Sequence, residues 1–300
     1  MKLSTILTEM GISFNCNLEK NINSLGLAGY NDGDAVCTFL DNIKYAKNIS
    51  DNVVMLITNQ ETYDKLDNCN NMGICVVKNP RKTFFEVHNH LADLKEYNRE
   101  AFKTEIGENC HISPLASVAS ENVHIGNNVI IEDFCTVESN TYIGNNCIIR
   151  SGCRIGSEGF EFKRDGDEIF RVKHVGGVIL EDNVEVHCNT CVNKAIYPWD
   201  DTILGKNVKI DDLVHIAHGV KIGAGSFVVT QSTIGGRTKV GRNVWIGIGA
   251  QIRNGLTIGD NAHINMGSVV TKSVAADENV SGNFAIEHSK FIDNLKKSVL

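Results

Sequence analysis

The fold is decided by the segment 180–270, whose centre has the sequence LGKNVKIDDLVHIAHGVKIG at residues 204–223. Every sixth residue of this segment is aliphatic, apart from one proline. The positions are Leu180, Val186, Val192, Pro198, Leu204, Ile210, Ile216, Ile222, Val228, Ile234, Val240, Ile246, Ile252, Ile258, Ile264 and Val270. An α-helix repeats every 3.6 residues and a strand every two, whereas a coil with three flat sides of about six residues each has this period. The segment therefore predicts a mainly β protein built on a left-handed parallel β-helix.

The same period begins earlier in the chain. Aliphatic residues recur six apart from Ile125 to Ile155, and Ile112 and Val118 precede them one residue out of register. Glycine and asparagine often follow the aliphatic residue, and both tolerate tight corners. The spacing from Ile155 to Leu180 is not a multiple of six. We therefore expect the chain between them to leave the wall of the coil.

Two interruptions of the repeat are predicted to be irregular. Residues 157–177 contain three phenylalanines, including Phe160, and four basic residues. Insertions of this length in a compact domain are usually functional, so we expect a lid or substrate contact. An insertion without a functional role is the alternative. Pro198 lacks the amide that a β-ladder uses, which predicts a small bulge.

The chain is expected to have three parts. Residues 1–100 predict a small N-terminal α/β domain, with helices near 5–10 and 81–94 and buried strands at 53–57 and 74–77. Residues 101–282 form the predicted coil. Residues 283–300 carry apolar side chains at helical spacing and predict a short C-terminal helix.

Composition excludes some classes of protein. The formal net charge of −7 argues against a general nucleic-acid binder, which needs a basic face. The ten cysteines show no disulfide framework, and Cys135, Cys147, Cys153 and Cys191 fall at or near side-facing positions of the repeat, where a small apolar residue fits. The N-terminus carries no apolar run typical of a signal peptide. We therefore expect reduced thiols in a soluble, cytoplasmic protein.

Flat outer walls predict self-association. Three copies of a three-sided coil can pack around an axis, so we expect a homotrimer with clefts between subunits. Eighteen residues make one turn, which places His218, Gly236 and Asn254 in one column, about 4.8 Å apart per turn. His215 and His218 flank the inward Ile216 and are predicted to point outward.

This column suits acyl transfer to an amine. A neutral imidazole can accept the proton of an amine near pH 7, so His218 is the candidate general base. A backbone N–H at Gly236 is the candidate donor to the oxyanion of the tetrahedral intermediate. Asp211 or Asp212 is a candidate for holding the imidazole tautomer. A satisfied corner histidine is the alternative for His218, and His215 is the candidate for a substrate contact.

Several motifs resemble one enzyme family over nearly the whole chain. They are Ser24-Leu25, Gly33-Asp34, the run Phe39-Leu40-Asp41-Asn42-Ile43-Lys44-Tyr45, Lys78-Asn79-Pro80, Gly156-Ser157-Glu158-Gly159-Phe160, Asp200-Asp201-Thr202-Ile203 and Lys209-Ile210-Asp211 before His215-Ile216-Ala217-His218. The chain resembles the LpxD-type UDP-3-O-(3-hydroxyacyl)glucosamine N-acyltransferases of lipid A biosynthesis, which are hexapeptide-repeat acyltransferases. The last motif, with its spacing, is the most specific of the set.

The resemblance implies where the acceptor binds. It implies a trimeric enzyme whose N-terminal domain binds the uridine of a UDP-amino sugar. Phe39 and Tyr45 would stack on the base, with Asn42 and Lys44 nearby. It assigns His218 to the general base and Gly236 to the oxyanion site.

The resemblance also implies an acyl donor that is a co-substrate, with no bound cofactor or metal. In the family the donor is a 3-hydroxyacyl chain on acyl carrier protein, carried by phosphopantetheine. Arg237, Lys239 and Arg242 are the candidates for contact with an acidic carrier protein or with the phosphates of coenzyme A, and a solvated basic rim is the alternative.

Departures from the family pattern keep other functions open. The chain has Leu256 after Asn254-Gly255, where the family has a histidine. One alternative is a short-chain, acetyl-type acyl-CoA sugar N-acyltransferase outside lipid A synthesis, acting on another amino sugar in a surface glycan. More remote alternatives are a zinc hydratase with His187, His215 and His218 as ligands, and a scaffold without catalysis.

Overall fold

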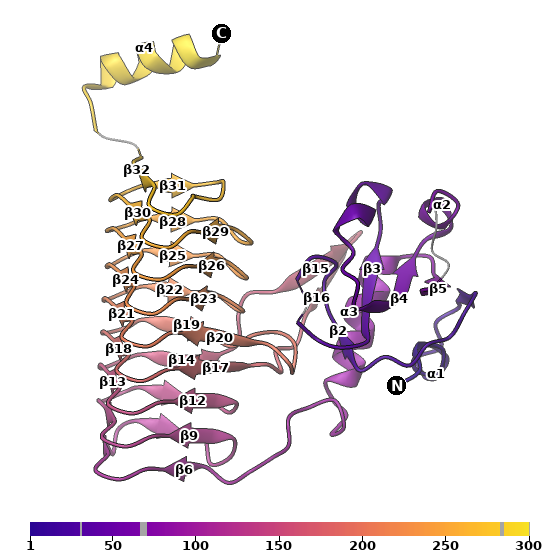
Figure 1. Cartoon of the computed structure of the whole chain (residues 1–300), viewed down its shortest axis with the longest axis horizontal. Helices are drawn as coiled ribbons and strands as arrows, with labels where there is room; N and C mark the ends of the chain where they lie inside the picture. The colour runs from indigo at the N-terminus through magenta and orange to yellow at the C-terminus, as the bar shows by residue number, and fades with distance from the viewer. Residues whose placement is uncertain (31, 67–70, 283–284, 300) are drawn as a thin grey trace.

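The computed structural model describes residues 1–30, 32–66, 71–282 and 285–299. A tall coil, each turn of which is built of short β-strands, lies beside a smaller α/β unit (Figure 1). A helix lies beyond the last turn of the coil. The coil has three parallel sheets, which we call the first, second and third wall. The predicted parallel β-helix is confirmed, while its left hand stays a prediction.

Among the described residues, the first wall has nine strands and the other two have eight each. The first wall contains β7 (His111–Ile112), β10 (Ile130–Ile131), β13 (Ile148–Ile149), β18 (Glu185–Val186), β21 (Lys209–Ile210), β24 (Phe227–Val228), β27 (Trp245–Ile246), β30 (His263–Ile264) and β32 (Asn279–Val280). The second wall contains β8 (Ser117–Val118), β11 (Thr136–Val137), β14 (Arg154–Ser157), β19 (Cys191–Asn193), β22 (His215–Ile216), β25 (Thr233–Ile234), β28 (Gln251–Ile252) and β31 (Val269–Val270). The third wall contains β6 (Glu105–Ile106), β9 (Val123–Ile125), β12 (Thr141–Ile143), β17 (Gly177–Leu180), β20 (Asp201–Leu204), β23 (Lys221–Ile222), β26 (Lys239–Val240) and β29 (Thr257–Ile258).

The aliphatic repeat fills the inside of the coil. Its members from Leu180 to Val270, except Pro198, are at most 7% exposed. Ile216 pairs with Ile234, which pairs with Ile252, so each turn in this region adds 18 residues. Burying this apolar stack removes it from water and is the main stabilising term of the coil. Cys135, Cys147 and Cys153 lie in the same core, and the cysteines among the described residues are free thiols.

Asparagines supply many corners of the coil. Asn128, Asn146, Asn207 and Asn243 have positive φ between 54° and 63°, a conformation that asparagine tolerates better than most residues. The side chain of Asn128 donates to Asn146 one turn away at 3.0 Å. The alternation of buried aliphatic residues and corner residues therefore explains why six residues form each side.

The two interruptions add chain outside the core. Residues between β14 and β17 form a two-stranded hairpin, β15 (Phe162–Asp165) and β16 (Glu168–Arg171), which projects toward the α/β unit (Figure 1). The chain around Pro198 forms a bulge, and Leu180 pairs with Leu204 across it. Both predicted departures from the wall are confirmed, and both carry contacts to the N-terminal unit.

The N-terminal unit is a five-stranded mixed sheet with helices. Its strand order is β1-β5-β4-β3-β2, and of these described strands β1 pairs antiparallel with β5 while the other neighbours are parallel. The elements are α1 (Leu3–Glu9), β1 (Asn15–Cys16), β2 (Ser24–Leu25), β3 (Val36–Leu40), the 3₁₀ helix η1 (Ile43–Asn48), β4 (Val53–Thr58), α2 (Gln60–Tyr63), β5 (Gly73–Val76) and α3 (Pro80–Leu91). Asn79 caps α3 by accepting from the N–H of Lys82 at 3.1 Å, and Pro80 occupies the first helical turn.

Aromatic residues of the bulge join the two units. Tyr197 is buried and stacks on Trp199, with ring centroids 5.5 Å apart, and the indole N–H of Trp199 donates to the carbonyl of Leu25 at 2.8 Å. The hydroxyl of Tyr30 lies 2.8 Å from the carbonyl of Gly219 on the coil. The bulge therefore fixes the α/β unit against the middle of the coil.

The C-terminal helix α4 (His288–Val299) follows the last strand and stands apart from the coil (Figure 1). The helix predicted for residues 283–300 is confirmed over this range, while residues 283, 284 and 300 lie outside the described part of the chain. Among the residues that the structure describes, no helix combines the length and the apolar character needed to cross a membrane.

Candidate active site

His218 occupies the corner that follows β22, and it is 7% exposed. Its carbonyl accepts from the N–H of Arg237 at 2.9 Å, and the carbonyl of Gly236 accepts from the N–H of Gly255 at 2.9 Å. The corners of successive turns therefore stack. A Cβ added to Gly236 would lie 2.7 Å from both Cε1 and Nε2 of His218, so the backbone of this glycine packs directly against the imidazole. Spacing and structure place these two residues side by side.

A carboxylate of the hairpin segment contacts the imidazole. Oε2 of Glu161 lies 3.1 Å from Nε2 of His218, and both side chains are about nine-tenths buried. A carboxylate only accepts, so Nε2 carries the proton and Nδ1 presents the lone pair. Burial alone would raise the pKa of Glu161, but the bond from His218 and the nearby ammonium of Lys163 together hold that pKa well below its usual range. Glu161 is therefore ionised beside the imidazole.

Asp211, the candidate for orienting His218, lies elsewhere. Its Oδ1 accepts from the N–H of Asp212 at 2.8 Å and its Oδ2 from the N–H of Thr230 at 3.1 Å, so it stabilises a corner on the first wall. The expectation that Asp211 or Asp212 pairs with His218 is wrong because a side of the coil separates the two corners. Glu161 takes that place, and its position in an insertion without a repeat gave no spacing from which to find it.

Helix α3 holds the hairpin segment in place. Asn89 on α3 accepts from the N–H of Lys173 at 2.9 Å, and its side-chain amide donates to the carbonyl of Arg171 at 2.7 Å. Lys82, near the start of the same helix, forms an ion pair with Glu168 at 2.6 Å. His88 is buried and bonds to the carbonyl of Lys173 at 2.9 Å. The N-terminal unit therefore positions the segment that carries Glu161.

A second histidine from this segment faces His218. His174 is 3% exposed, and the centroids of the two imidazole rings are 5.5 Å apart at a steep angle. Gly159 lies beside both rings, because a Cβ there would be 3.1 Å from Nε2 of His174 and 3.3 Å from Cδ2 of His218. The sequence placed His174 in the interrupting loop but did not distinguish it from the other histidines.

A pocket of about 350 Å³ opens between the α/β unit and the coil. It is lined by Leu27, Ala28, Gly29, Phe39, Leu40, Asp41, Tyr45, Asn48, Arg81, Phe85, Lys163 and Arg237. Phe39 and Tyr45, two of the predicted substrate contacts, share this pocket with three cationic side chains from α3, the hairpin and the coil. The ammonium of Lys163 also lies over the ring of Phe85, 4.2 Å from its centroid.

The other residues predicted to contact the acceptor substrate are not among those that line this pocket. The side chain of Asn42 caps η1 by accepting from the N–H of Lys44 at 3.1 Å, and the Lys44 ammonium lies 4.7 Å from the centroid of Tyr45. Phe160 is 88% exposed on the hairpin segment, close to Phe162. His215 is exposed on the second wall. The structure thus brings Lys44 to Tyr45 and leaves Phe160 and His215 open to solvent.

The three predicted donor contacts are not grouped. Arg237 lines the pocket beside Phe39, next to Gly236. The ammonium of Lys239 lies 6.0 Å from the ring centroid of Tyr30, and Arg242 forms an exposed ion pair with Asp260 at 3.6 Å. Asn254 is exposed on the turn beyond Gly236. The position of Arg237 favours a role toward the acceptor pocket.

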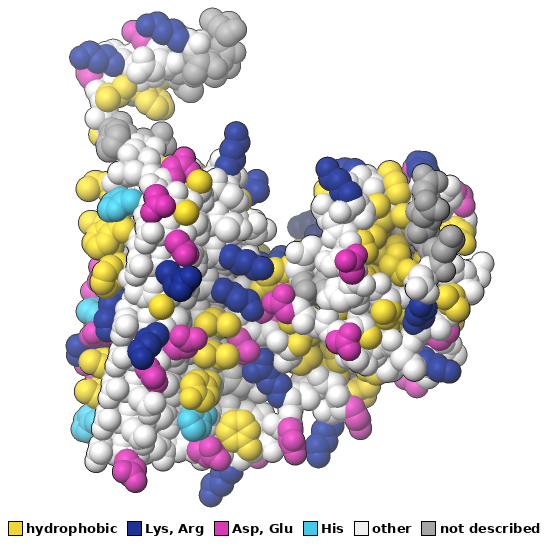
Figure 2. Space-filling model, viewed as in Figure 1, with side chains coloured by type: hydrophobic (Ala, Val, Ile, Leu, Met, Phe, Trp, Pro, Cys, Tyr) yellow, Lys and Arg dark blue, Asp and Glu magenta, His cyan; other side chains and the backbone are white. Residues whose placement is uncertain are grey.

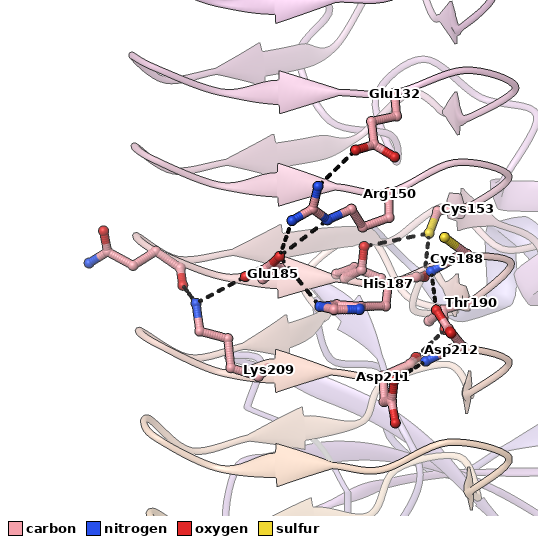
Figure 3. A network of polar contacts seen from close by, with 12 residues as sticks. Glu132, Arg150, Cys153, Glu185, His187, Cys188, Thr190, Lys209, Asp211 and Asp212 are labelled. Carbon is pink, nitrogen blue, oxygen red and sulfur yellow. Dashed lines mark hydrogen bonds and ion pairs between the residues drawn. The ribbon is translucent and has the colours of Figure 1, made fainter.

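A separate polar network lies on the middle turns of the coil, along the first wall (Figure 3). Arg150 bridges Glu132 and Glu185, with both nearest N–O distances at 2.8 Å, and Glu185 lies 3.4 Å from His187. Possible metal-ligand atoms of His187, Asp211 and Asp212 lie within 4.8 Å of one another. Within the described part of the chain no other such group is found, so the zinc set of His187, His215 and His218 is not assembled.

Comparison with known proteins agrees with this architecture. Residues 122–157, 201–236 and 237–272 match the family described as bacterial transferase hexapeptide (six repeats). These three segments of the coil are therefore similar to hexapeptide-repeat transferases. The chain is 34% identical over 139 residues to UDP-3-O-acylglucosamine N-acyltransferase of Wolinella succinogenes, covering 46% of this chain and 43% of that protein. It is 38% identical over 133 residues to the protein of the same name from Campylobacter lari, covering 44% and 41%.

The similarities to these relatives cover only part of each protein. The chain spans less than half the length of these curated relatives. Among solved structures, an Arabidopsis UDP-N-acetylglucosamine acyltransferase superposes with a TM-score of 0.51 at 21% identity, covering 60% of this chain and 68% of that one. That likeness supports the coil as a fold.

Proposed function

We propose that the protein is an N-acyltransferase that moves an acyl group from a thioester to the amino group of a UDP-linked amino sugar. The observation that carries the proposal is the buried contact between His218 and Glu161, packed against the backbone of Gly236, next to a pocket that combines aromatic and cationic side chains. The resemblance to UDP-3-O-acylglucosamine N-acyltransferases supports the same reaction class.

His218 acts as the general base. Because Nε2 donates to Glu161, Nδ1 holds the lone pair, and it forms no hydrogen bond with the residues that the structure describes. The amine nitrogen attacks the thioester carbonyl carbon, and one of its protons moves to Nδ1 of His218. The resulting imidazolium is stabilised by the ionised carboxylate of Glu161, and the proton then leaves with the thiol.

The backbone of Gly236 stabilises the oxyanion. Its N–H donates no hydrogen bond to a described residue, whereas the N–H groups of Gly235 and Arg237 donate to neighbouring turns at 2.9 Å. An unpaired N–H in a buried corner of the coil stabilises the negative charge that develops on the carbonyl oxygen during attack. The missing side chain of Gly236 also lets this backbone pack directly against the imidazole of His218.

The pocket binds the nucleotide. Phe39 and Tyr45 offer ring faces to a base, while Arg81, Lys163 and Arg237 offer positive charge to a diphosphate. Arg237 is the next residue to Gly236, so a diphosphate there would direct the sugar toward His218. The pocket thus offers ring faces for the base and positive charge for the diphosphate, and Arg237 joins it along the chain to the proposed oxyanion donor.

The first wall is the proposed trimer interface. Phe227 and Trp245 on neighbouring strands are 44% and 40% exposed, and their ring centroids are 5.9 Å apart. Hydrophobic and histidine side chains gather along this edge of the coil (Figure 2, left). A cyclic trimer would bury this stripe and form the clefts in which a phosphopantetheine arm of acyl carrier protein or coenzyme A binds. Lys239 and Arg242 remain the proposed contacts for that donor.

The decisive experiment is single-turnover acyl transfer with purified protein, UDP-amino sugars and a panel of thioesters. In His218→Ala the single-turnover rate constant should fall by about 10²- to 10⁴-fold, while the oligomeric state is retained. His124→Ala is the matched control, because this imidazole also lies against a carboxylate, 3.2 Å from Oε2 of Glu105, but stands on β9 of the third wall and belongs to no predicted site. Full turnover by the His218→Ala variant would disprove the proposed base.

The thioester panel also separates the two candidate donors. Preference for 3-hydroxyacyl chains on acyl carrier protein would support a lipid A-type reaction. Equal or better turnover with acetyl-CoA would instead assign the protein to short-chain acylation of a surface-glycan sugar.

A further inference from the structure

Asp41 brings a carboxylate without a protein partner to the pocket between the α/β unit and the coil. It lines this pocket together with Phe39 and Tyr45, and three cationic side chains line it as well. Within the described part of the chain, the Asp41 carboxylate forms neither an ion pair nor a hydrogen bond. A negative charge repels an anionic ligand, so this carboxylate favours a nucleoside diphosphate only if a group of that ligand donates to it.

The end of β3 places Asp41 at the ligand-binding edge of the sheet. Asp41 directly follows β3, which pairs in parallel with β2 and β4. Ligands of such α/β sheets bind outside the carboxyl ends of the strands. Phe39, two residues earlier, packs against Phe84 with ring centroids 5.0 Å apart. The strand end therefore presents a fixed aromatic ring and a free carboxylate to the same pocket.

The three parts of a uridine diphosphate differ in how well they suit a carboxylate, which accepts hydrogen bonds and donates none. The diphosphate is itself an anion. Uracil has a single N–H between two carbonyl oxygens, and these oxygens would face the negative charge. The ribose has two adjacent hydroxyls, both of which donate, and they match the two oxygens of one carboxylate. Acidic side chains bind ribose hydroxyls in this way in dinucleotide-binding sheets.

We infer that Asp41 accepts from the 2′- and 3′-hydroxyls of the ribose, and that it makes the pocket select ribonucleoside over 2′-deoxyribonucleoside diphosphate sugars. The inference rests on the proposed function and names the class of nucleotide that the site takes. The ribose is bonded directly to the base, so a base stacked on Phe39 carries its hydroxyls into the neighbourhood of Asp41. A hydroxyl that is absent leaves the carboxylate unpaired beside an anionic ligand, which is unfavourable.

The test is isothermal titration with UDP and dUDP, which differ only in the 2′-hydroxyl. The wild type should bind UDP about tenfold more tightly, as expected for one hydrogen bond to a charged group. In Asp41→Ala the Kd for UDP should rise by about tenfold while that for dUDP changes little, so the ratio approaches one. A carboxylate that only faces solvent predicts the opposite, because removing its charge would tighten the binding of both anions.

Two variants serve as controls. Asn48→Ala shortens another exposed polar side chain of the same pocket, at the end of η1, without changing the charge, so it should change both Kd values by the same factor. Asp51→Ala removes an exposed carboxylate that does not line the pocket and should leave both affinities unchanged. Asp41→Asn keeps one acceptor oxygen and should retain part of the preference for UDP, and it replaces Asp41→Ala if that variant fails to fold.

The outcomes separate this inference from the proposed function. Equal affinity of the wild type for UDP and dUDP, or the wild-type ratio in a folded Asp41→Ala protein, would overturn the ribose contact alone. Tighter binding of CDP than of UDP, lost in Asp41→Ala, would also overturn it, by assigning the carboxylate to the amino group of a base. A wild type that binds no UDP would overturn the proposed nucleotide pocket and the inference together.

Discussion

Glu161 and His218 form a buried contact of 3.1 Å between a hairpin that leaves the coil and a corner of the coil itself. Because α3 holds the hairpin, the position of this carboxylate depends on the N-terminal unit as well as on the repeat. The proposed nucleotide site and the proposed base are thus mechanically linked. Binding of a nucleotide between the two units would act on the same segment that carries Glu161.

The charge of Glu161 should matter for catalysis. Glu161→Gln keeps the shape of the side chain but removes the anion that stabilises the imidazolium of His218. We expect kcat to fall by about 10- to 100-fold, equivalent to one to two pKa units, with a small change in KM. Steady-state kinetics from pH 5 to 9 would measure it. An unchanged kcat across this range would show that Glu161 is only structural.

The same carboxylate should contribute a pH-dependent stability. The pKa of Glu161 is lower in the folded protein than the value of about 4.3 expected when unfolded, so the unfolded chain binds more protons between the two values. The contribution is complete above the unfolded pKa and declines as the pH falls below it. The difference in Tm between wild type and Glu161→Gln should therefore shrink below about pH 4.3. A difference that grows on acidification would contradict the assignment.

Adding one methyl group at Gly236 should disable the site. In Gly236→Ala the new Cβ would lie 2.7 Å from the ring of His218, which must then move. We expect kcat to fall by about 10²-fold or more because the base and the oxyanion donor both shift. Gly249→Ala is the control: its Cβ meets no atom within 4 Å, although its φ of 65° makes the change mildly destabilising. A loss of kcat in the control equal to that of Gly236→Ala would argue for a general effect of the fold.

Removing the charge of Arg81 should weaken binding of a nucleoside diphosphate but not binding of a nucleoside. Arg81→Ala removes one of the three cations of the pocket, so the Kd for UDP should rise by about tenfold while that for uridine changes little. Isothermal titration with both ligands would measure it. Lys65→Ala removes an exposed cation that pairs with Glu61 on α2, and should leave both affinities unchanged. Equal weakening of UDP and uridine by Arg81→Ala would disprove the diphosphate contact.

The first wall should control assembly. Trp245→Glu places a charge in the exposed aromatic stripe, and we expect the trimer to dissociate because a charge buried in an apolar interface is unfavourable. Light scattering after gel filtration would give the mass. Tyr142→Glu, at an exposed aromatic position on the third wall, is the control and should remain trimeric. A wild-type protein that is monomeric at micromolar concentration would refute the trimer itself.

Much of the fold could be predicted because the coil is local and periodic. The six-residue aliphatic repeat predicts the three walls, the buried positions and the stacking of His218 on Gly236, since each turn in that region repeats 18 residues. The bulge at Pro198 was predicted from its missing amide. That Tyr197 and Trp199 would use the bulge to anchor the N-terminal unit was not predicted.

The partners of His218 were decided by tertiary structure alone. Asp211 and Asp212 are the nearest carboxylates by spacing, yet they bond at another corner, whereas Glu161 and His174 reach His218 from an insertion. The sequence by itself determined the coil and the column at its corner, because a repeat places each residue relative to the turn before it. An insertion has no such period, and its path depends on packing against α3, so only the folded chain shows which of its side chains meet the imidazole.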